Sequence, residues 1–268
     1  MSSKPSLILL LVATISLAPQ DHIKVSFDRN SNTTATSAFK FKTVSPPAKD
    51  DAATNAKMML LDGDVDPNGG GLSALVDGFA PTTEDQPAAN LFFTAGTGGG
   101  RFRIDLGKPI EIAQINSYSW HPGSRGPQVY RVWGSDESNP KFNPEPRGTR
   151  DLASNGWTQI ALVDTRSSQG QDGGQYGVSI SSSRGSLGTY RYLVFDVYVT
   201  EVSDNWGNTF YSEVDVIAKK QSSSSKAAGG TVFVSITGRR RTEFAFEGAV
   251  ESCFRFVTNI LRDLRDAA

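Results

Sequence analysis

Short runs of alternating apolar and polar residues dominate the sequence between residues 37 and 218. In residues 191–199 an apolar side chain recurs at every second position, which places those side chains on one face of an extended strand. Alternation of this kind is typical of antiparallel sheets that bury one face and leave the other in water. Similar runs occur at 38–41, 102–106, 110–120, 129–133, 160–163, 176–180 and 210–218.

The spacing of these runs predicts the fold class. No convincing amphipathic helix separates them, so a βαβ arrangement is not expected. Glycine, with 26 residues, gathers together with proline and serine between the runs, as turn residues do between short strands. We therefore predict an all-β fold, a two-sheet antiparallel jelly-roll sandwich over residues 37–218.

The amino-terminal residues have the pattern of a secretory signal. Lys4 precedes an apolar stretch at 7–18 that is too short to span a bilayer. We predict a signal peptide at 1–18, with an uncleaved interfacial anchor as the alternative, and a flexible polar lead-in at 19–36. The prediction places the protein outside the cell or in the cell envelope, with no membrane span after signal removal.

The composition changes again at residue 219. A Ser-rich linker is predicted at 219–230, followed by an extension of unknown role at 231–268 that carries a strand pattern and then a helical one. So short a segment cannot form much of a core alone. We expect this extension to dock on the sandwich or on a partner, or to be the start of a truncated region. The single cysteine, Cys253, excludes an intramolecular disulfide.

Composition narrows the possible functions. A hydrophobic fraction of 38% and a charged fraction of 21% are those of a soluble globular protein. The net charge of −1 gives no reason to expect a nucleic-acid partner. Only two histidines are present, and no nucleophile elbow, zinc-binding helix or phosphate loop occurs. We expect a protein that is not an enzyme.

Three stretches resemble the discoidin, or coagulation-factor-type C, domain family, whose fold is galactose-binding-like. Residues 76–82 hold an Asp-Gly turn with a threonine soon after, and 102–107 end a strand in Asp-Leu-Gly. Residues 125–136 are similar to the family's arginine–proline turn, strand and Ser-Asp turn. The last two strands, 190–195 and 210–216, are similar to those that close the jelly roll. Terminal cysteines of many animal members are absent, as in bacterial carbohydrate-binding members.

The resemblance implies a structural calcium ion. The positions that match the family's calcium loop and closing glutamate are Asp77, Thr82 and Glu213, with backbone carbonyls completing the oxygen shell. The alternative is an ordinary Asp-Gly turn beside a salt-bridged glutamate. A second acidic stretch at 62–68 lacks the turn glycine and the final glutamate of a calcium-binding loop, so we interpret it as a solvated turn.

Two loops offer the residue types that sugar recognition requires, a flat aromatic ring and fixed polar groups. One contains Trp120, His121 and Arg125, and the other contains Asn205 and Trp206. Both are expected at one end of the sandwich, where binding residues gather. Three alternatives stay open: Trp120 is a core residue, Arg125 only pins its loop, or His121 only caps a turn.

These observations lead to one expected function and two alternatives. We expect an exported, non-catalytic module that binds a carbohydrate or glycoconjugate, or mediates adhesion, with a structural calcium ion. The first alternative is a scaffold module of the cell envelope that binds another exported protein. The second is a glycan-active hydrolase, which requires two carboxylates converging in a cleft.

Overall fold

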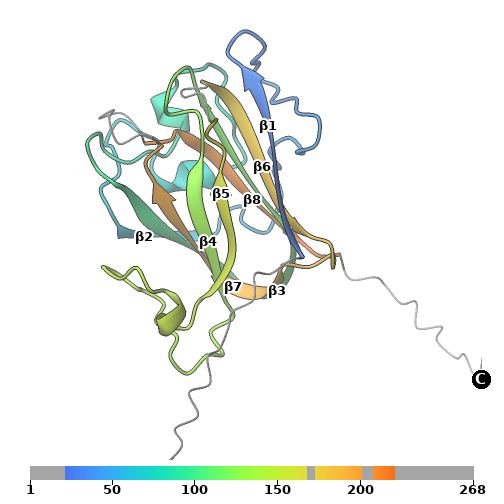
Figure 1. Ribbon diagram of the computed structural model, residues 1–268, viewed down its shortest axis with the longest axis vertical. Coiled ribbons are helices and arrows are strands. Elements are labelled where there is room, and N and C mark those ends of the chain that lie inside the picture. The colour runs from blue at the N-terminus through green and yellow to red at the C-terminus, as the bar shows by residue number, and fades with distance from the viewer. Residues whose placement is uncertain (1–21, 168–172, 201–207, 221–268) are drawn as a thin grey trace, which may run out of the picture. The chain divides into compact units, whose positions relative to one another are not determined.

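The computed structural model describes residues 22–167, 173–200 and 208–220. The predicted signal peptide and the extension at 231–268 lie outside these ranges, as does all of the predicted linker beyond residue 220. Every strand pairing among the described residues is antiparallel. The elements, shown in Figure 1, are β1 (Ile23–Ser31), β2 (Lys57–Asp62), η1 (Leu72–Leu75), η2 (Pro87–Ala89), β3 (Gly99–His121), β4 (Val129–Ser135), η3 (Ala153–Asn155), β5 (Thr158–Asp164), β6 (Gly174–Ser182), β7 (Gly188–Tyr198) and β8 (Tyr211–Ala218).

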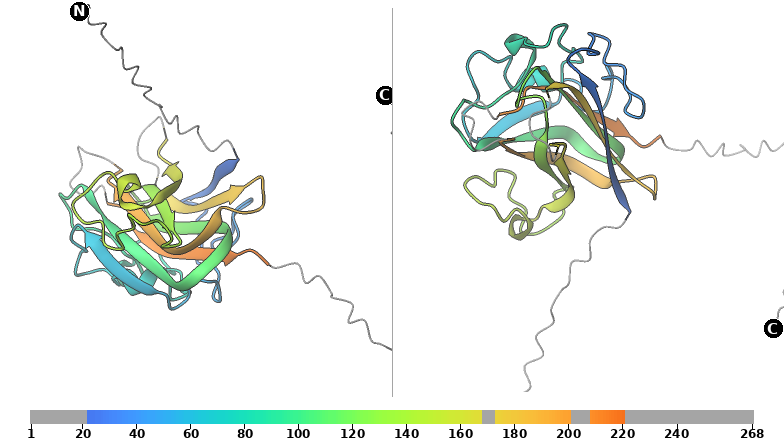
Figure 2. Two further views of the ribbon diagram at one scale, coloured as in Figure 1. Left: turned by 90° about the horizontal axis from the view of Figure 1, so that it is seen from below. Right: turned by 45° about the horizontal axis from the view of Figure 1, so that its top comes forward.

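The long strand β3 belongs to both layers of the sandwich. Its first part, residues 99–105, pairs with β2 and β7, and its last part, residues 114–121, pairs with β6 and β8. The register shifts between Asp105 and Ile110, and Gly107 there has φ of 79°, a backbone conformation that glycine adopts without a steric penalty. One layer is therefore β2-β3-β7-β4-β5 and the other is β1-β6-β3-β8 (Figures 1 and 2).

The main core lies between the two layers. Leu193 and Phe195 of β7 contribute to it from one layer, and Val178 and Ile180 of β6 from the other. The period-two spacing of the sequence puts these side chains on the inner faces, as predicted. The all-β, antiparallel sandwich expected from the sequence is confirmed.

A second apolar cluster lies on the outer face of the layer that contains β8. Phe39 and Val44 cover Tyr118 and Trp120 of β3 there, and all four side chains are buried. The prediction of a strand at residues 38–41 is wrong, because this segment is an irregular cover over the sheet. Its apolar residues pack onto the outer face of β3, and its backbone pairs with no strand.

The predicted flexible lead-in at 19–36 is also corrected. Residues 23–31 form β1, which pairs along its whole length with β6, so the sandwich begins at Ile23 and not at residue 37. Val25 and Phe27 alternate with polar residues, but both remain partly in water at the edge of the sheet. That exposure explains why the segment is rich in polar residues and was interpreted as a lead-in. Among the described residues, no helix is long and apolar enough to cross a bilayer.

Candidate functional site

Glu213 carries a buried carboxyl group in which one of the two oxygen atoms has no hydrogen-bond partner. It lies on β8 opposite Tyr118 of β3, and its side chain is fully buried. The backbone N–H of Gly78 donates a hydrogen bond to Oε2 at 3.0 Å. Oε1 has no hydrogen-bond partner within the described part of the chain. Buried polar atoms without a partner are rare in native proteins, and binding of a cation is one way in which such a carboxylate oxygen is satisfied.

The electrostatic surroundings of Glu213 favour either a proton or a cation. Burial and the nearby carboxylates of Asp215, Asp77 and Asp51 raise the pKa of Glu213 to about 9. Burial also raises the pKa of Asp215 to about 6. Asp215, however, accepts hydrogen bonds from the Ala48 N–H at 3.1 Å and from the Tyr118 hydroxyl at 3.0 Å. Glu213, with Oε1 unpartnered, therefore has the weaker hydrogen bonding of these two buried carboxyl groups.

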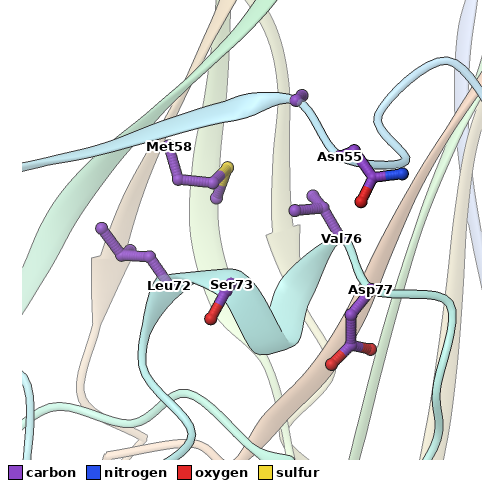
Figure 3. A pocket seen from close by; sticks show the side chains of 7 residues that line it. Asn55, Met58, Leu72, Ser73, Val76 and Asp77 are labelled. Carbon is purple, nitrogen blue, oxygen red and sulfur yellow. The ribbon is translucent and has the colours of Figure 1, made fainter.

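The structure brings Asp77 near Glu213, because the N–H of the next residue, Gly78, donates to the Glu213 carboxylate. Asp77 precedes Gly78, is exposed, and accepts a hydrogen bond from the Phe79 N–H through Oδ1 at 2.8 Å. It also lies at the rim of an open hollow of about 530 Å³. Figure 3 shows side chains that line this hollow between β2 and η1, the apolar Met58, Leu72 and Val76 and the polar Asn55, Ser73 and Asp77. Solvent and ions can thus reach the Asp77 carboxylate.

Thr82, the third predicted calcium ligand, is exposed, and its side chain is hydrogen-bonded to a neighbouring residue. Both its N–H and its hydroxyl donate to Oε1 of Gln86, at 2.8 and 3.2 Å. No group of three or more His, Cys, Asp or Glu side chains able to hold a metal occurs among the residues described. Calcium also takes carbonyl and hydroxyl oxygens, so a carboxylate oxygen without a partner beside a second carboxylate fits this ion.

Arg125 fixes the loop between β3 and β4. Its guanidinium lies over the rings of Phe92 and Phe210, with Cζ at 4.6 and 4.0 Å from the ring centroids. Its Nε donates to the carbonyl of Asn208 at 3.0 Å, and its carbonyl accepts from the Phe210 N–H at 2.9 Å. The side chain is buried. Arg125 therefore holds this loop against the start of β8, which is the pinning role weighed from the sequence.

His121 lies next to Arg125 at the end of β3 and is half-buried. Its ring packs edge-on against Phe210, with centroids 4.7 Å apart. The Gly123 N–H donates to Nδ1 at 3.0 Å, so in the neutral ring Nε2 is the nitrogen that carries the proton. Burial and the charge of Arg125 lower the pKa of His121 to about 4, against an opposing effect of Asp85. At neutral pH the ring is an uncharged hydrogen-bond donor with a fixed orientation.

Trp120 is not available as a sugar-stacking surface. Its side chain is only 5% exposed, and its indole packs edge-on against Phe39 with centroids 5.7 Å apart. It points to the outer-face cluster, away from solvent, because residues 38–44 cover that part of β3. The core position weighed as the alternative is the correct one. Asn205 and Trp206 lie outside the described residues.

One exposed aromatic residue was missed in the sequence. Phe79 is 68% exposed and follows directly after the Asp-Gly turn of the predicted calcium loop. Its exposure has no clear signal in the sequence, because the apolar residues Leu75, Val76 and Ala80 lie close by.

The carboxylate pair required by a hydrolase is not formed by the acidic residues of β8. Glu213 and Asp215 lie two positions apart on one face of the strand, and both side chains are fully buried. Neither side chain reaches an open cleft where a glycosidic bond could lie between them. Within the described ranges, these are the carboxyls whose pKa is raised.

The sequence matches no protein-family model and no curated protein. Solved structures similar to the chain include lectin domains and carbohydrate-binding modules. The lectin domain of lectinolysin complexed with Lewis B antigen is 13% identical, with 65% of this chain and 99% of that domain covered and a TM-score of 0.41. Chitosan-binding module 1 of the chitosanase/glucanase of Paenibacillus sp. IK-5 is 15% identical, with 63% and 99% covered and a TM-score of 0.40. The family 32 module of Clostridium perfringens NanJ in complex with galactose is 12% identical, with 59% and 92% covered and a TM-score of 0.38.

Proposed function

We propose that this chain is an exported, non-catalytic module that binds a carbohydrate at the loop end of its sandwich and is stabilised by a calcium ion. The observation that carries the proposal is His121, a half-buried neutral imidazole held in one orientation by Phe210 and Gly123. A donor that is fixed before the ligand arrives loses little conformational freedom on binding, so its hydrogen bond contributes more affinity. Sugar hydroxyls are suitable acceptors for it.

Calcium belongs at Glu213. In this proposal the unpartnered Oε1 of Glu213 and the carboxylate of Asp77 would hold the ion, and backbone carbonyls of the turn would complete its oxygen shell. When bound, the ion provides the positive charge that keeps Glu213 ionised in its buried setting. This chain's own contribution is to hold the Asp77–Gly78 turn against β8 through the Gly78 N–H. This contact links the turn at 77–82 to β8, although the two segments are far apart in the sequence.

Arg125 acts as a positioning residue in this proposal. Its guanidinium packs on the ring of Phe210, against which His121 also packs, and its Nε donates to the carbonyl of Asn208. Its charge also lowers the pKa of His121, which keeps the imidazole neutral over the whole physiological range. A neutral donor suits uncharged hydroxyl groups and avoids the strong hydration of an imidazolium.

Replacing His121 with alanine tests the proposal. A glycan array probed with the protein, with and without calcium, first identifies the sugar. His121→Ala is expected to weaken binding of that sugar by about 1–2 kcal/mol, or roughly five- to thirtyfold, because one oriented hydrogen bond is lost. His121→Gln retains a donor and should keep more of the affinity. Binding by His121→Ala equal to that of the unchanged protein, measured by titration calorimetry, would remove His121 from the site.

Trp206 supplies the aromatic surface in this proposal. It is flanked by Asp204, Asn205 and Asn208, so the sequence provides no apolar neighbour for its indole. We expect Trp206→Ala to retain the fold and to weaken sugar binding by about 1–3 kcal/mol. Tryptophan fluorescence titration and a thermal melt of the variant measure both effects. A variant that unfolds would place Trp206 in the core, and one that binds the sugar normally would assign the stacking to another residue.

A further inference from the structure

The ring of Phe79 is presented to solvent by a rigid backbone. It is the most exposed large hydrophobic side chain among the described residues, at 68%. Its N–H is bonded to Oδ1 of Asp77, and the N–H of the preceding Gly78 is bonded to Glu213. Gly78 has φ of 74°, a left-handed conformation that glycine adopts without the steric cost that a side chain brings. The turn thus holds the aromatic ring outward in a defined position.

A hollow of about 280 Å³ opens beside this ring. Pro46 and Pro47 form part of its wall, and both have fixed φ angles, so that wall is stiff. Lys49 also lines it. A Cβ on Gly78 would lie only 3.1 Å from the Cα of Lys49, so the two backbones that carry Lys49 and Phe79 are in direct contact.

Backbone strain is concentrated at another residue that lines this hollow, Phe39. Its φ is 42°, in the left-handed region, which is unusual for a bulky residue. The conformation persists because the ring is held edge-on between Tyr118 and Trp120, with centroids 6.2 and 5.7 Å away. Strained positions occur most often where a binding surface requires them. This strain is an observation independent of the exposure of Phe79.

The charges around the hollow favour an anion. Lys49 is exposed, and none of the ion pairs among the described residues involves it. No carboxylate lines the hollow. The ammonium group of Lys49 in this position would attract a carboxylate or a sulfate of a ligand.

The geometry points to a second sugar site in which an acidic pyranose stacks its C–H face on Phe79, enters the hollow between Phe79 and the Pro46–Pro47 wall, and places its anionic group on Lys49. This inference rests on the proposed carbohydrate-binding function and specifies a ligand class for it. Stacking on an aromatic face binds the apolar side of the ring, and the lysine selects the charged ring over a neutral one. His121 is not among the residues that line this hollow.

Titration calorimetry of the full chain with trigalacturonate and with its methyl ester tests the site. The two ligands share the same rings and differ in charge. The unchanged protein is expected to bind trigalacturonate about tenfold or more tightly than the ester. Phe79→Ala should weaken binding of both by about five- to a hundredfold, as for an anchoring aromatic contact. Lys49→Gln should remove the difference between the two ligands. A sulfated carrageenan trisaccharide distinguishes sulfate from carboxylate as the preferred anion.

Two exposed residues on other strands provide matched controls. Leu162→Ala on β5 removes an apolar side chain that is 53% exposed, and Lys24→Gln on β1 removes an exposed charge. Neither should change either affinity. The inference is overturned if the unchanged protein binds neither ligand, if it binds both equally, or if Phe79→Ala binds as the controls do. Loss of trigalacturonate binding in His121→Ala but not in Phe79→Ala would place the sugar at the loop end, so the proposed function would stand while this site would not.

Discussion

Trp120→Ala is expected to destabilise the fold by about 3–5 kcal/mol, the range found when a large buried aromatic side chain is removed. The indole is 5% exposed and packs against Phe39, which itself has a strained backbone conformation. Without the indole, the segment that covers the outer face of β3 loses its main contact, and a cavity is left that the stiff sheet cannot close. Urea denaturation followed by circular dichroism measures the loss as a lower midpoint at an unchanged slope.

Phe79→Ala is the control for this prediction, because it also removes an aromatic ring, but one that is 68% exposed. A surface substitution of this kind changes the free energy of unfolding by no more than about 0.5 kcal/mol. If Trp120→Ala were as stable as Phe79→Ala while sugar binding fell, the indole would be a ligand contact, as the sequence first suggested. The two variants therefore separate a core role from a binding role at Trp120.

The strands that the sequence predicted well are those with one face in the main core. In β7 the alternating residues Leu193, Phe195 and Val197 lie in the main core as predicted, but Tyr192 and Val194 on the opposite face are buried as well, so that face is not in water. β1 was missed because it is an edge strand whose apolar side chains, such as Phe27, remain partly in water. The opposite error occurred at residues 38–41, whose alternating pattern arises from packing onto another strand. Periodicity indicates burial of one face but does not identify the partner.

Some features of the candidate sites could also be predicted from the sequence, and others could not. The resemblance joined Asp77 to Glu213 across more than a hundred residues, and the hydrogen bond from Gly78 to Glu213 places them together. The pinning role of Arg125 was foreseen as an alternative, because an arginine in a loop finds carbonyls and rings nearby. The sequence left the burial of Trp120 as one of two alternatives, since the segment that covers it comes about eighty residues earlier in the chain. Exposure depends on such long-range contacts.

Calcium is expected to raise the melting temperature, and to raise it more as the pH increases. In the metal-free protein the pKa of Glu213 is about 9, raised from 4.5 by burial and by Asp215, Asp77 and Asp51. Between these two values the native state holds a proton that the unfolded chain has lost. The stabilisation from this proton is complete below about pH 4.5 and is lost as the pH rises toward 9, by up to about 1.4 kcal/mol for each pH unit. Asp215, with a pKa raised to about 6, adds a change of the same sign at lower pH.

Calcium reverses this trend because it requires the ionised carboxylate and replaces the proton. With free metal at a hundred to a thousand times its dissociation constant, stabilisation reaches about 3–4 kcal/mol, and it grows from pH 6 to pH 9 as the competing proton becomes scarcer. Glu213→Gln keeps an uncharged side chain at every pH, so it should lose the response to calcium and also the part of the alkaline destabilisation that Glu213 causes. Glu84→Gln, a change at an exposed carboxylate, should retain both. Thermal melts in calcium and in chelator at pH 6 and pH 8 measure these effects. Equal melting temperatures in calcium and chelator at both pH values would show that Glu213 holds a proton and no exchangeable ion.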